Sequence, residues 1–336
     1  MKAIVLEEPG RAVVSEVDEP RVKEDEVLLQ VRRIGLCGSD LNSYRGKNPL
    51  VSYPRIPGHE IAATVMDPGS HGEWEAGTQV TLSPYAACGQ CPACERGRPN
   101  ACRDNKTLGV QCDGALTERI AVKASKLYRA SLSLKELCLV EPLTVGFHAV
   151  GRGRVMAEDT VAVFGCGGVG LGVVAGAAFR GARVIGVDVD DAKLETARKA
   201  GAAEAINSKT GGLHAQLLEI TGGRGPDVVI EAIGTPATYR AAVEEVAYAG
   251  RVVYIGWAKD EVAYETRPFV HKELDILGSR NAVAEDFRAV IGMLEAKRFP
   301  VEAAVTHIVA FEETPKILEE WSREPGRFTK IMVEVS

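Results

Sequence analysis

The sequence predicts an α/β protein with two domains, one rich in β-strands and one built on a doubly wound parallel sheet. Three observations lead to this prediction. The chain has 336 residues, which is enough for two separate cores. Its first part, to about residue 150, alternates short β-branched runs with turns rich in Gly, Pro and Asp. From Thr160 onward, apolar runs alternate with helical segments at the spacing of βαβ units.

The β-rich part is predicted from short runs bounded by turn residues. The strands expected there are Val27–Val31, Ile61–Val65 and Gln79–Leu82. The character of the sequence changes around Val145–Gly153. After about Asp286 we expect a helix, a strand-like segment VEAAVTHIVAF at 301–311, another helix, and a final strand KIMVEV at 330–335.

The second part shows continuous apolar strands, which a parallel sheet covered on both faces requires. The strands expected there are Val161–Phe164, Arg183–Val187, Asp227–Glu231, Arg251–Ile255 and Leu274–Leu277. A helix is expected at Lys193–Ala200.

Composition narrows the class of protein. The formal net charge is −6, and 46% of the residues are hydrophobic, so nothing favours binding to nucleic acid or to an anionic membrane. The N-terminus lacks the basic and apolar regions of a secretion signal, and the most apolar long window, Val161–Ala178, is rich in glycine. We therefore expect a cytoplasmic protein, in which disulfides are the weaker interpretation of its eight cysteines.

Four of these cysteines form the strongest local motif. Cys88, Cys91, Cys94 and Cys102 have the spacing C-x2-C-x2-C-x7-C. Four thiolates this close in sequence can enclose one tetrahedral zinc and leave no position for water or substrate. The motif therefore predicts a structural zinc site, with an iron–sulfur cluster or chance clustering as the alternatives.

A glycine-rich loop follows the first strand of the parallel sheet. Gly165, Gly167, Gly168, Val169 and Gly170 belong to the sequence GCGGVG, which directly follows VAVF and opens a helix. In this context the loop predicts a dinucleotide site, because glycines permit a tight turn and close approach of a pyrophosphate to the helix N-terminus. Glycines needed for packing alone are the other interpretation.

The strand RVIGV ends at Asp188. An acidic side chain there accepts hydrogen bonds from the ribose hydroxyls and repels a 2′-phosphate. No arginine follows Asp188 closely, so the sequence favours NAD over NADP.

Three separate short motifs could together form a second metal site. They are Cys37-Gly38-Ser39-Asp40, Gly58-His59-Glu60 and Glu141-Pro142. A thiolate, an imidazole and one or two carboxylates suit a catalytic zinc with an open position. Taken singly, each has an ordinary structural interpretation: a core cysteine, a hydrogen-bonded histidine and a turn.

The sequence resembles the zinc-containing medium-chain dehydrogenase/reductase superfamily over essentially its whole length. The resemblance rests on CGSD at 37–40, GHE at 58–60, the four cysteines, EPLTVGFHA at 141–149 and GCGGVG at 165–170. It implies a GroES-like catalytic domain at 1–148 and 286–336, a Rossmann NAD-binding domain at 149–285, and an active site in the cleft between them. It also implies a homodimer or homotetramer.

The resemblance assigns roles to individual residues. Cys37, His59 and Glu60 match catalytic zinc ligands, and Glu141 matches a carboxylate that either ligates the zinc or holds its water and substrate. The positions that match cofactor contacts, beyond the glycine loop, are Val169, Asp188, Lys193, Ile255, Gly256, Ser279 and Arg280. Ser39 is the expected first proton acceptor. Many relatives have a histidine where this chain has Asn42, so the proton path beyond Ser39 must differ.

Within the superfamily, Glu141-Pro142 is similar to the polyol, threonine and sugar-acid branch. The stretches SYPRIPGHE, PYAACGQCPAC and HKELDILGSRNAVAEDF are similar to bacterial L-galactonate 5-dehydrogenases. The resemblance therefore implies oxidation of a secondary alcohol of a sugar acid by NAD, with a neutral polyol or L-threonine as alternative substrates. Cations in segments expected to border the cleft could bind a carboxylate or could be solvated: Arg45, Lys47, Arg55, Lys272 and Arg280. The alternative from another functional class is a sensor that binds NAD, is held together by a structural zinc, and catalyses no reaction.

Overall fold

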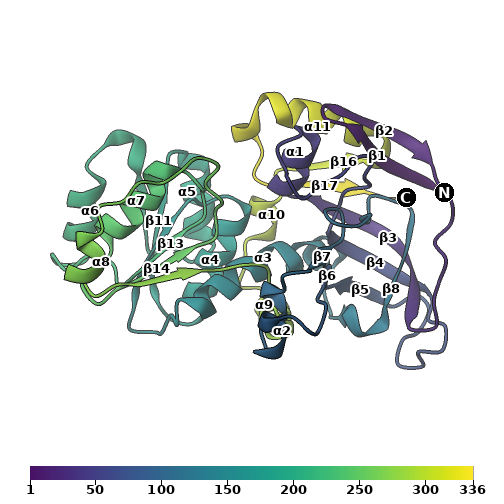
Figure 1. The fold of residues 1–336 in the computed structure, drawn as a ribbon, viewed down its shortest axis with the longest axis horizontal. Helices are drawn as coiled ribbons and strands as arrows, with labels where there is room; N and C mark the ends of the chain where they lie inside the picture. Colours follow the sequence, from purple (N-terminus) through teal and green to yellow (C-terminus); the bar gives the residue numbers. More distant parts are fainter. Residues whose placement is uncertain (336) are drawn as a thin grey trace. The chain divides into compact units, whose positions relative to one another are not determined.

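The computed structural model describes residues 1–335, and the chain divides into two compact units (Figure 1). Unit 1 comprises Met1–Glu141 and Val301–Ser336, and unit 2 comprises Pro142–Pro300. The sequence predicts borders after residues 148 and 285. The first border differs because helix α3 (Leu134–Arg152) runs through the stretch where the sequence changes character. Among residues 1–335, no helix is long and apolar enough to cross a membrane.

Unit 1 is built on a seven-stranded sheet in the order β16-β17-β3-β4-β5-β9, with β8 also paired to β3. Its strands are β3 (Glu26–Leu36), β4 (Glu60–Asp67), β5 (Gln79–Leu82), β8 (Arg119–Lys123), β9 (Leu127–Arg129), β16 (His307–Ala310) and β17 (Ile331–Glu334). β3 alternates buried and half-buried residues until Arg33, after which Ile34–Leu36 are buried throughout. This buried end of β3 pairs with β4 on one side and with β17 on the other, so the C-terminal tail completes the sheet.

Two short ribbons and several helices complete unit 1. The ribbons are β1 (Lys2–Glu8) with β2 (Arg11–Glu16), and β6 (Tyr85–Ala86) with β7 (Lys106–Thr107). The α-helices are α1 (Gly38–Tyr44), α2 (Pro92–Glu95), α10 (Val301–Ala304) and α11 (Thr314–Arg323). In Figure 1 the C-terminal strands β16 and β17, drawn in yellow, lie beside the purple N-terminal strands.

One prediction for the tail was wrong in part. Residues 301–311 were expected to be strand-like, but Val301–Ala304 form helix α10 and only His307–Ala310 form a strand. The difference follows from composition, because the sequence VEAA contains two alanines and a glutamate, which are good helix formers. The β-branched run begins only at Val305.

Unit 2 contains a six-stranded sheet that is parallel throughout, in the order β12-β11-β10-β13-β14-β15. Its strands are β10 (Thr160–Phe164), β11 (Arg183–Asp188), β12 (Glu204–Asn207), β13 (Val228–Glu231), β14 (Arg251–Tyr254) and β15 (Asp275–Gly278). The order reverses at β10, so right-handed crossovers place helices on both faces. The predicted fold class is therefore confirmed, and β12 is the strand that the sequence analysis did not identify.

The helices of unit 2 connect these strands. They are α4 (Gly168–Phe179), α5 (Asp191–Lys199), α6 (Leu213–Ile220), α7 (Pro236–Glu245), α8 (Arg267–His271) and α9 (Ala284–Glu295). The core between helices and sheet is lined by apolar residues from the strands, including Phe164, Ile185, Val187 and Val229.

Helices α3 and α4 touch through their backbones at two glycines. A Cβ on Gly146 would lie 2.3 Å from the carbonyl carbon of Gly172 and from the nitrogen of Val173. A Cβ on Gly172 would lie 2.9 Å from the carbonyl oxygen of Leu143. Because backbone atoms cannot rotate away, any side chain at Gly146 must separate the helices.

We expect Gly146→Ala to lower the melting temperature of the protein by several degrees, because overpacking of this kind costs about 1–3 kcal/mol. Gly151→Ala in the same helix is the matched control. Its Cβ would meet nothing closer than the Arg180 side chain at 3.5 Å, so it should raise stability slightly or leave it unchanged. Thermal unfolding followed by circular dichroism checks both, and equal melting temperatures for the two variants would contradict the close helix packing.

Candidate functional site

The four clustered cysteines lie in the segment between the paired strands β6 and β7 of unit 1. The sulfur–sulfur distances are 3.6 Å for Cys91–Cys94, 3.8 Å for Cys91–Cys102 and 3.5 Å for Cys88–Cys102. None of the four is in a disulfide. A zinc ion bound tetrahedrally at ~2.3 Å has sulfur–sulfur edges of about 3.8 Å, so the four thiols already have the geometry of a closed zinc site. We call residues 87–105 the cysteine lobe.

The local sequence explains how the cysteine lobe folds. Gly89 has a φ of +79°, a left-handed conformation that favours glycine, and Pro92 occupies the first turn of the short helix α2. Several hydrogen bonds lower the pKa of Cys91 to about 6. The hydrogen bond from the backbone N–H of Cys94 has the largest effect. A thiol with such a pKa is readily ionised, as a metal ligand must be.

A second group of possible metal ligands lies at the buried end of β3. The ligand atoms of Cys37, His59 and Glu60 all lie within 4.8 Å of one another. Cys37 follows β3 directly and caps the N-terminus of α1, whereas His59 precedes β4, which begins at Glu60. The antiparallel pairing places Gly35 opposite Glu60, so the end of one strand lies beside the start of the other. This pairing brings together two motifs that are about twenty residues apart in sequence.

Asp40 joins the two ligand loops. Its Oδ2 accepts a hydrogen bond from the backbone N–H of Cys37 at 2.9 Å, and its Oδ1 accepts one from Gly58 at 3.3 Å. Oδ1 also lies 3.7 Å from Nδ1 of His59. Ser39 Oγ lies 3.4 Å from the other ring nitrogen, Nε2. The sequence analysis quoted Asp40 in the CGSD motif without giving it a role, and the structure shows that it orients both loops.

Lys330 was not foreseen at all. Its Nζ donates to both carboxylate oxygens of Glu60, at 2.6 and 2.7 Å, and to the carbonyl oxygen of Leu36 at 3.3 Å. Both side chains of this ion pair are almost fully buried. The glycine at position 35 leaves space for it, since a Cβ there would lie 1.9 Å from Glu60 Oε2. Lys330 is 270 residues from Glu60 in sequence, so no local pattern could reveal the pair.

Glu141 is buried in α3 and lies outside the group of three ligand atoms within 4.8 Å. The hydroxyl of Tyr85 donates a hydrogen bond to Glu141 Oε1. Burial raises the pKa of Glu141 to about 7 and raises the pKa of Tyr85 well above its ordinary value. The sequence analysis interpreted Glu141-Pro142 as a possible turn, but both residues lie inside the helix. It did not identify Tyr85.

The donor set at this site fits a zinc ion. Burial lowers the pKa of His59, but the negative charges of Asp40, Cys37 and Glu141 together raise it well above its ordinary value. The same field that favours a charged imidazole favours a bound cation in its place. His59 Nδ1 is buried and, among the described residues, has no hydrogen-bond partner. A soft sulfur, an imidazole and a carboxylate are ligands that zinc accepts, and three protein ligands leave one position open.

The glycine loop of unit 2 has the shape that a dinucleotide needs. Gly165 has a φ of +93°, and a Cβ on Gly170 would lie 1.7 Å from the carbonyl oxygen of Gly165. Gly167 caps α4, and a Cβ there would meet nothing within 4 Å, so the helix N-terminus is open to a ligand. Gly168 and Val169 form the first turn of α4. This end of the helix offers free amide donors and the positive end of its dipole.

Asp188 ends the neighbouring strand β11 and is tied to the loop. Its Oδ2 accepts a hydrogen bond from Cys166 at 2.8 Å, and its Oδ1 accepts from Val189 at 2.7 Å and from Asp190 at 3.1 Å. These bonds fix the carboxylate beside the glycine loop. Each carboxylate oxygen has further acceptor capacity for a ribose hydroxyl. Lys193 is half-buried in the first turn of the following helix, α5.

The other expected cofactor residues follow the strands on the far side of β10. Ile255 and Gly256 come directly after β14, and Ser279 and Arg280 come directly after β15. Since all strands of this sheet are parallel, these residues lie at the same edge as the glycine loop. Ser279 Oγ is buried and has no hydrogen-bond partner within residues 1–335, as expected of a group that meets a ligand.

Gly256 also has a packing role, because a Cβ there would lie 2.3 Å from the nitrogen of Gly234. The buried Glu231, which the sequence analysis placed only in a strand, shapes this loop. Its Oε1 accepts hydrogen bonds from Ile233 at 2.9 Å, from Gly234 at 2.7 Å and from Thr238 Oγ1 at 2.7 Å.

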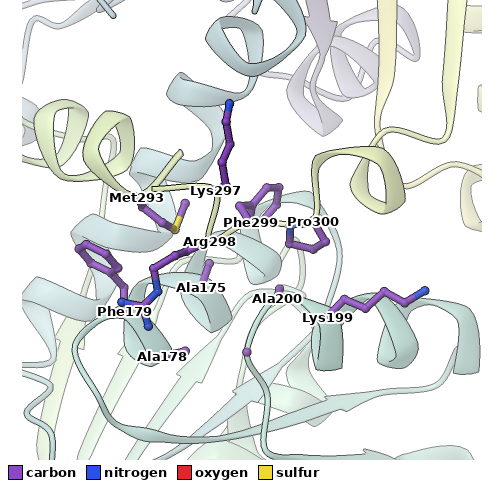
Figure 2. Close-up of a pocket in the computed structure, with 11 residues that line it drawn as sticks. Ala175, Ala178, Phe179, Lys199, Ala200, Met293, Lys297, Arg298, Phe299 and Pro300 are labelled. Atoms are coloured by element: carbon purple, nitrogen blue, oxygen red, sulfur yellow. The ribbon is translucent and has the colours of Figure 1, made fainter. Parts of the chain in front are cut away.

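A hollow of about 350 Å³ in unit 2 is not the cofactor site. Figure 2 shows its lining, which includes Phe179 from α4, Lys199 near the end of α5, and Arg298. Phe179 is the last residue of a twelve-residue helix that begins at Gly168, so the hollow lies about 18 Å along the helix from the glycine loop. Arg298 stacks over the Phe179 ring at 5.2 Å.

Lys272, Arg45 and Arg55, which the sequence offers as substrate-binding cations, have structural partners. Lys272 donates to the carbonyls of Val243, Glu244 and Val246, so it closes the end of α7. The Arg45 guanidinium donates to Ser322, and Arg55 pairs with Asp113 at 2.9 Å. Lys47 is exposed and Arg280 is half-buried.

Fold and site together define a zinc-dependent dehydrogenase, and comparison with known proteins agrees. Residues 23–131 match the family described as alcohol dehydrogenase GroES-like domain, and residues 168–296 match the family described as zinc-binding dehydrogenase. The chain belongs to this zinc-binding dehydrogenase family, within the zinc-containing medium-chain dehydrogenase/reductase superfamily. It is an oxidoreductase.

Similar proteins span nearly the whole chain. An uncharacterised zinc-type alcohol dehydrogenase-like protein of Haemophilus influenzae is 37% identical, with 98% of both chains covered. L-galactonate-5-dehydrogenase of Escherichia coli is 31% identical, covering 93% of this chain and 92% of its own. Sorbitol dehydrogenase of Bacillus subtilis is 32% identical, and the match covers 99% of this chain and 97% of that protein. An Escherichia coli CFT073 alcohol dehydrogenase crystallised with NADH is 30% identical, covers 99% of both chains and has a TM-score of 0.91.

We expect Cys94→Ser to reduce the zinc content of the purified protein from two ions per chain to one and to lower its melting temperature. The loss of one of four thiolates opens the tetrahedral site, and the lobe has little apolar core to order it without the metal. Cys112→Ser is the matched control, since Cys112 is free and lies outside the lobe. Elemental analysis and thermal unfolding provide the measurements, and two retained zinc ions in Cys94→Ser would contradict the assignment.

Proposed function

We propose that this chain oxidises a secondary alcohol of a sugar acid similar to L-galactonate and passes the hydride to NAD. The observation that carries the proposal is the convergence of Cys37, His59 and Glu60 at the buried end of β3. A protein that only bound NAD, such as a sensor stapled by the cysteine lobe, would have no use for a second, mixed set of metal ligands with an open position.

Cys37, His59 and Glu60 would hold the zinc in this site, while Asp40 binds the backbones of both ligand loops and Lys330 holds Glu60 in place. When bound, zinc supplies Lewis acidity that lowers the pKa of a substrate hydroxyl, much as it lowers the pKa of water from 15.7 to about 7. Ser39 Oγ, near His59, accepts the substrate proton first and passes on its own hydroxyl proton. Ser39 is half-exposed, so the proton can leave to water without the histidine that many relatives have in place of Asn42.

The preference for NAD rests on Asp188. Its carboxylate is fixed beside the glycine loop, where it can accept hydrogen bonds from ribose hydroxyls and would repel a 2′-phosphate. Unit 2 is accordingly assigned as the NAD-binding domain and unit 1 as the catalytic domain. NAD bound there supplies the hydride acceptor, and the glycine loop, Val169, Lys193, Ile255, Gly256, Ser279 and Arg280 form its surroundings.

The sugar acid is favoured by similarity to L-galactonate-5-dehydrogenase. A carboxylate would need a cation to bind it, and the candidates are Lys47, which is exposed, and Arg280, which directly follows β15. The second candidate is a neutral polyol, which the similarity to sorbitol dehydrogenase favours and which needs no such cation. L-threonine is a third substrate to test.

We further propose that the protein is a homo-oligomer, either a dimer or a tetramer, and that it works in the cytoplasm. Strand β15 is one of the two outer strands of the parallel sheet, and its Ile276 is 43% exposed. An uncovered edge strand with an exposed apolar side chain is suited to pairing with a second copy. The eight free cysteines suit a reducing compartment.

Substrate class is tested by following NADH formation with hexonates, hexitols, pentitols and L-threonine. We expect the highest kcat/KM with a hexonate such as L-galactonate. A hexitol or pentitol that is turned over at least as well would replace the sugar acid with a polyol. No NADH with any alcohol, together with intact NAD binding, would favour the sensor.

The catalytic metal site is tested by Cys37→Ser and His59→Ala. Both should abolish turnover, because each removes a ligand of the proposed zinc, and both should leave NAD binding nearly intact, because the glycine loop is in another unit. Cys112→Ser and His214→Ala are the matched controls from outside the site. Kinetics and calorimetric titration with NAD measure the two effects, and full activity in either ligand variant would refute the assignment.

The cofactor preference is tested by Asp188→Asn. Removal of the negative charge should raise the KM for NAD and shift the ratio of kcat/KM for NAD and NADP toward NADP by roughly tenfold or more, equivalent to about 1.4 kcal/mol. Asp190→Asn is the matched control. Asp190 caps α5 from two residues further along, and asparagine caps equally well. If the ratio of kcat/KM for NAD and NADP is unchanged in Asp188→Asn, another group must distinguish the ribose hydroxyls from a 2′-phosphate.

A further inference from the structure

Three large apolar side chains are exposed at the edge of the parallel sheet that carries the glycine loop. Val189 directly follows β11, Ile233 follows β13 and Trp257 follows β14, and their exposed fractions are 59%, 47% and 62%. Because the strands are parallel, all three residues follow carboxyl ends and share the edge at which a dinucleotide binds. Exposed apolar surface at such an edge is typical of a surface that contacts a ligand.

The three side chains occur in a fixed order across the sheet. Val189 is next to Asp188, the residue assigned to the adenosine ribose. Ile233 lies against the glycine loop, since a Cβ on Gly165 would come within 2.6 Å of Ile233 Cγ1. Trp257 follows β14, which is two strands from β10 on the side away from β11. Neighbouring strands are ~4.8 Å apart, so β14 is about 10 Å from β10, toward the nicotinamide half of a dinucleotide that crosses this edge.

The loop that carries Trp257 is fixed by its neighbours. A Cβ on Gly234 would lie between 2.7 and 2.9 Å from three backbone atoms of Trp257, so the two backbones are in close contact. The hydroxyl of Tyr239 donates a hydrogen bond to the carbonyl of Gly256, and its ring stacks on the ring of Tyr254 at 4.0 Å. Among residues 1–335, none hydrogen-bonds to the indole or stacks on it. The indole is therefore held at the cofactor edge with its surface available to a ligand.

A substrate that passes hydride to NAD must lie against the nicotinamide ring, so its carbon chain meets groups at this end of the cofactor site. Sugar acids and polyols have a linear carbon chain whose C–H groups form apolar faces between the hydroxyls. An indole has a broad apolar face and one N–H donor, a combination that suits such a chain.

We propose that Trp257 is a specificity-determining residue that packs against the carbon chain of the substrate beyond the reacting carbon. This inference rests on the proposed function and deepens it, because it requires a substrate with an extended chain. A short secondary alcohol offers the same reacting hydroxyl but has no chain to cover the indole. The energy gained from the contact therefore separates long substrates from short ones.

The first test compares a long and a short alcohol in Trp257→Ala and Trp257→Phe. The long substrate is L-galactonate or D-sorbitol, whichever is oxidised faster, and the short one is propan-2-ol. We expect Trp257→Ala to lower kcat/KM for the long substrate by about tenfold, as the loss of an aromatic contact does, and to leave kcat/KM for propan-2-ol unchanged. Trp257→Phe keeps an aromatic face and should fall between wild type and Trp257→Ala. If propan-2-ol is not oxidised, its inhibition constant against the long substrate gives the same comparison.

Tyr248→Ala is the matched control. Tyr248 is an aromatic residue with a similar exposed fraction, 64%, but it precedes β14 and so lies at the opposite edge of the sheet. Its replacement should leave kcat/KM for both alcohols unchanged. The Kd for NAD should be unchanged in all three variants, because the glycine loop and Asp188 are intact.

A second test uses the wild-type protein and needs no turnover. The chain has three tryptophans, and Trp74 and Trp321 are buried, so acrylamide in solution quenches mainly the fluorescence of Trp257. With NADH bound, we expect the long substrate to reduce this quenching because it covers the indole, whereas propan-2-ol should not. Trp257→Phe should show no effect of either alcohol on the quenching of the remaining fluorescence.

Failure of this inference and failure of the proposed function give different results. Equal losses of kcat/KM for the long and the short alcohol in Trp257→Ala would overturn the inference and leave the dehydrogenase in place, as would no loss for the long one. Quenching that the long substrate does not change would also overturn it, and so would oxidation of L-threonine alone. Absence of NADH formation with every alcohol would overturn the proposed function, and this inference with it.

Discussion

The proposed catalytic site depends on the buried ion pair between Glu60 and Lys330. Glu60 starts β4, and Lys330 immediately precedes β17, near the end of the chain. The two meet because β17 and β4 both pair with β3. A buried ion pair contributes little net stability, but removal of one partner leaves an uncompensated charge that costs about 3–5 kcal/mol. The C-terminal tail is therefore needed to neutralise a proposed metal ligand as well as to complete the sheet.

The same arrangement recurs around the other ligands. Asp40 holds the Cys37 and Gly58 backbones, and Tyr85 holds Glu141. The two buried carboxylates, Glu60 and Glu141, are each bound by a residue from another segment of the chain. The charges of the site are thus placed before any ligand binds.

The two metal sites of unit 1 differ in a way that follows from their donors. The cysteine lobe offers four thiols from one short segment, and their spacing closes the tetrahedron without help from the rest of the fold. The proposed catalytic cluster has one sulfur, one imidazole and one carboxylate from two strand ends, and Asp40 and Lys330 bind its loops and its carboxylate. A closed site is local and stabilising, whereas an open site requires support from a wider part of the structure.

The sequence by itself determined whatever depends on neighbours in the chain. The cysteine spacing, the GCGGVG loop after a buried strand, and Asp188 at the end of the next strand are local patterns, and so is the succession of βαβ units that defines the parallel sheet. Resemblance to the superfamily added the group of Cys37, His59 and Glu60, which single residues could not establish. The strand predicted at residues 301–304 was wrong, although the alanines there favour the helix that the structure has. Only the tertiary structure decided which groups surround the ligands: Lys330 beside Glu60, Tyr85 beside Glu141, and other partners for Lys272. The physical reason is that strand pairing joins segments far apart in sequence, and the compensation of a buried charge leaves no periodic pattern along the chain.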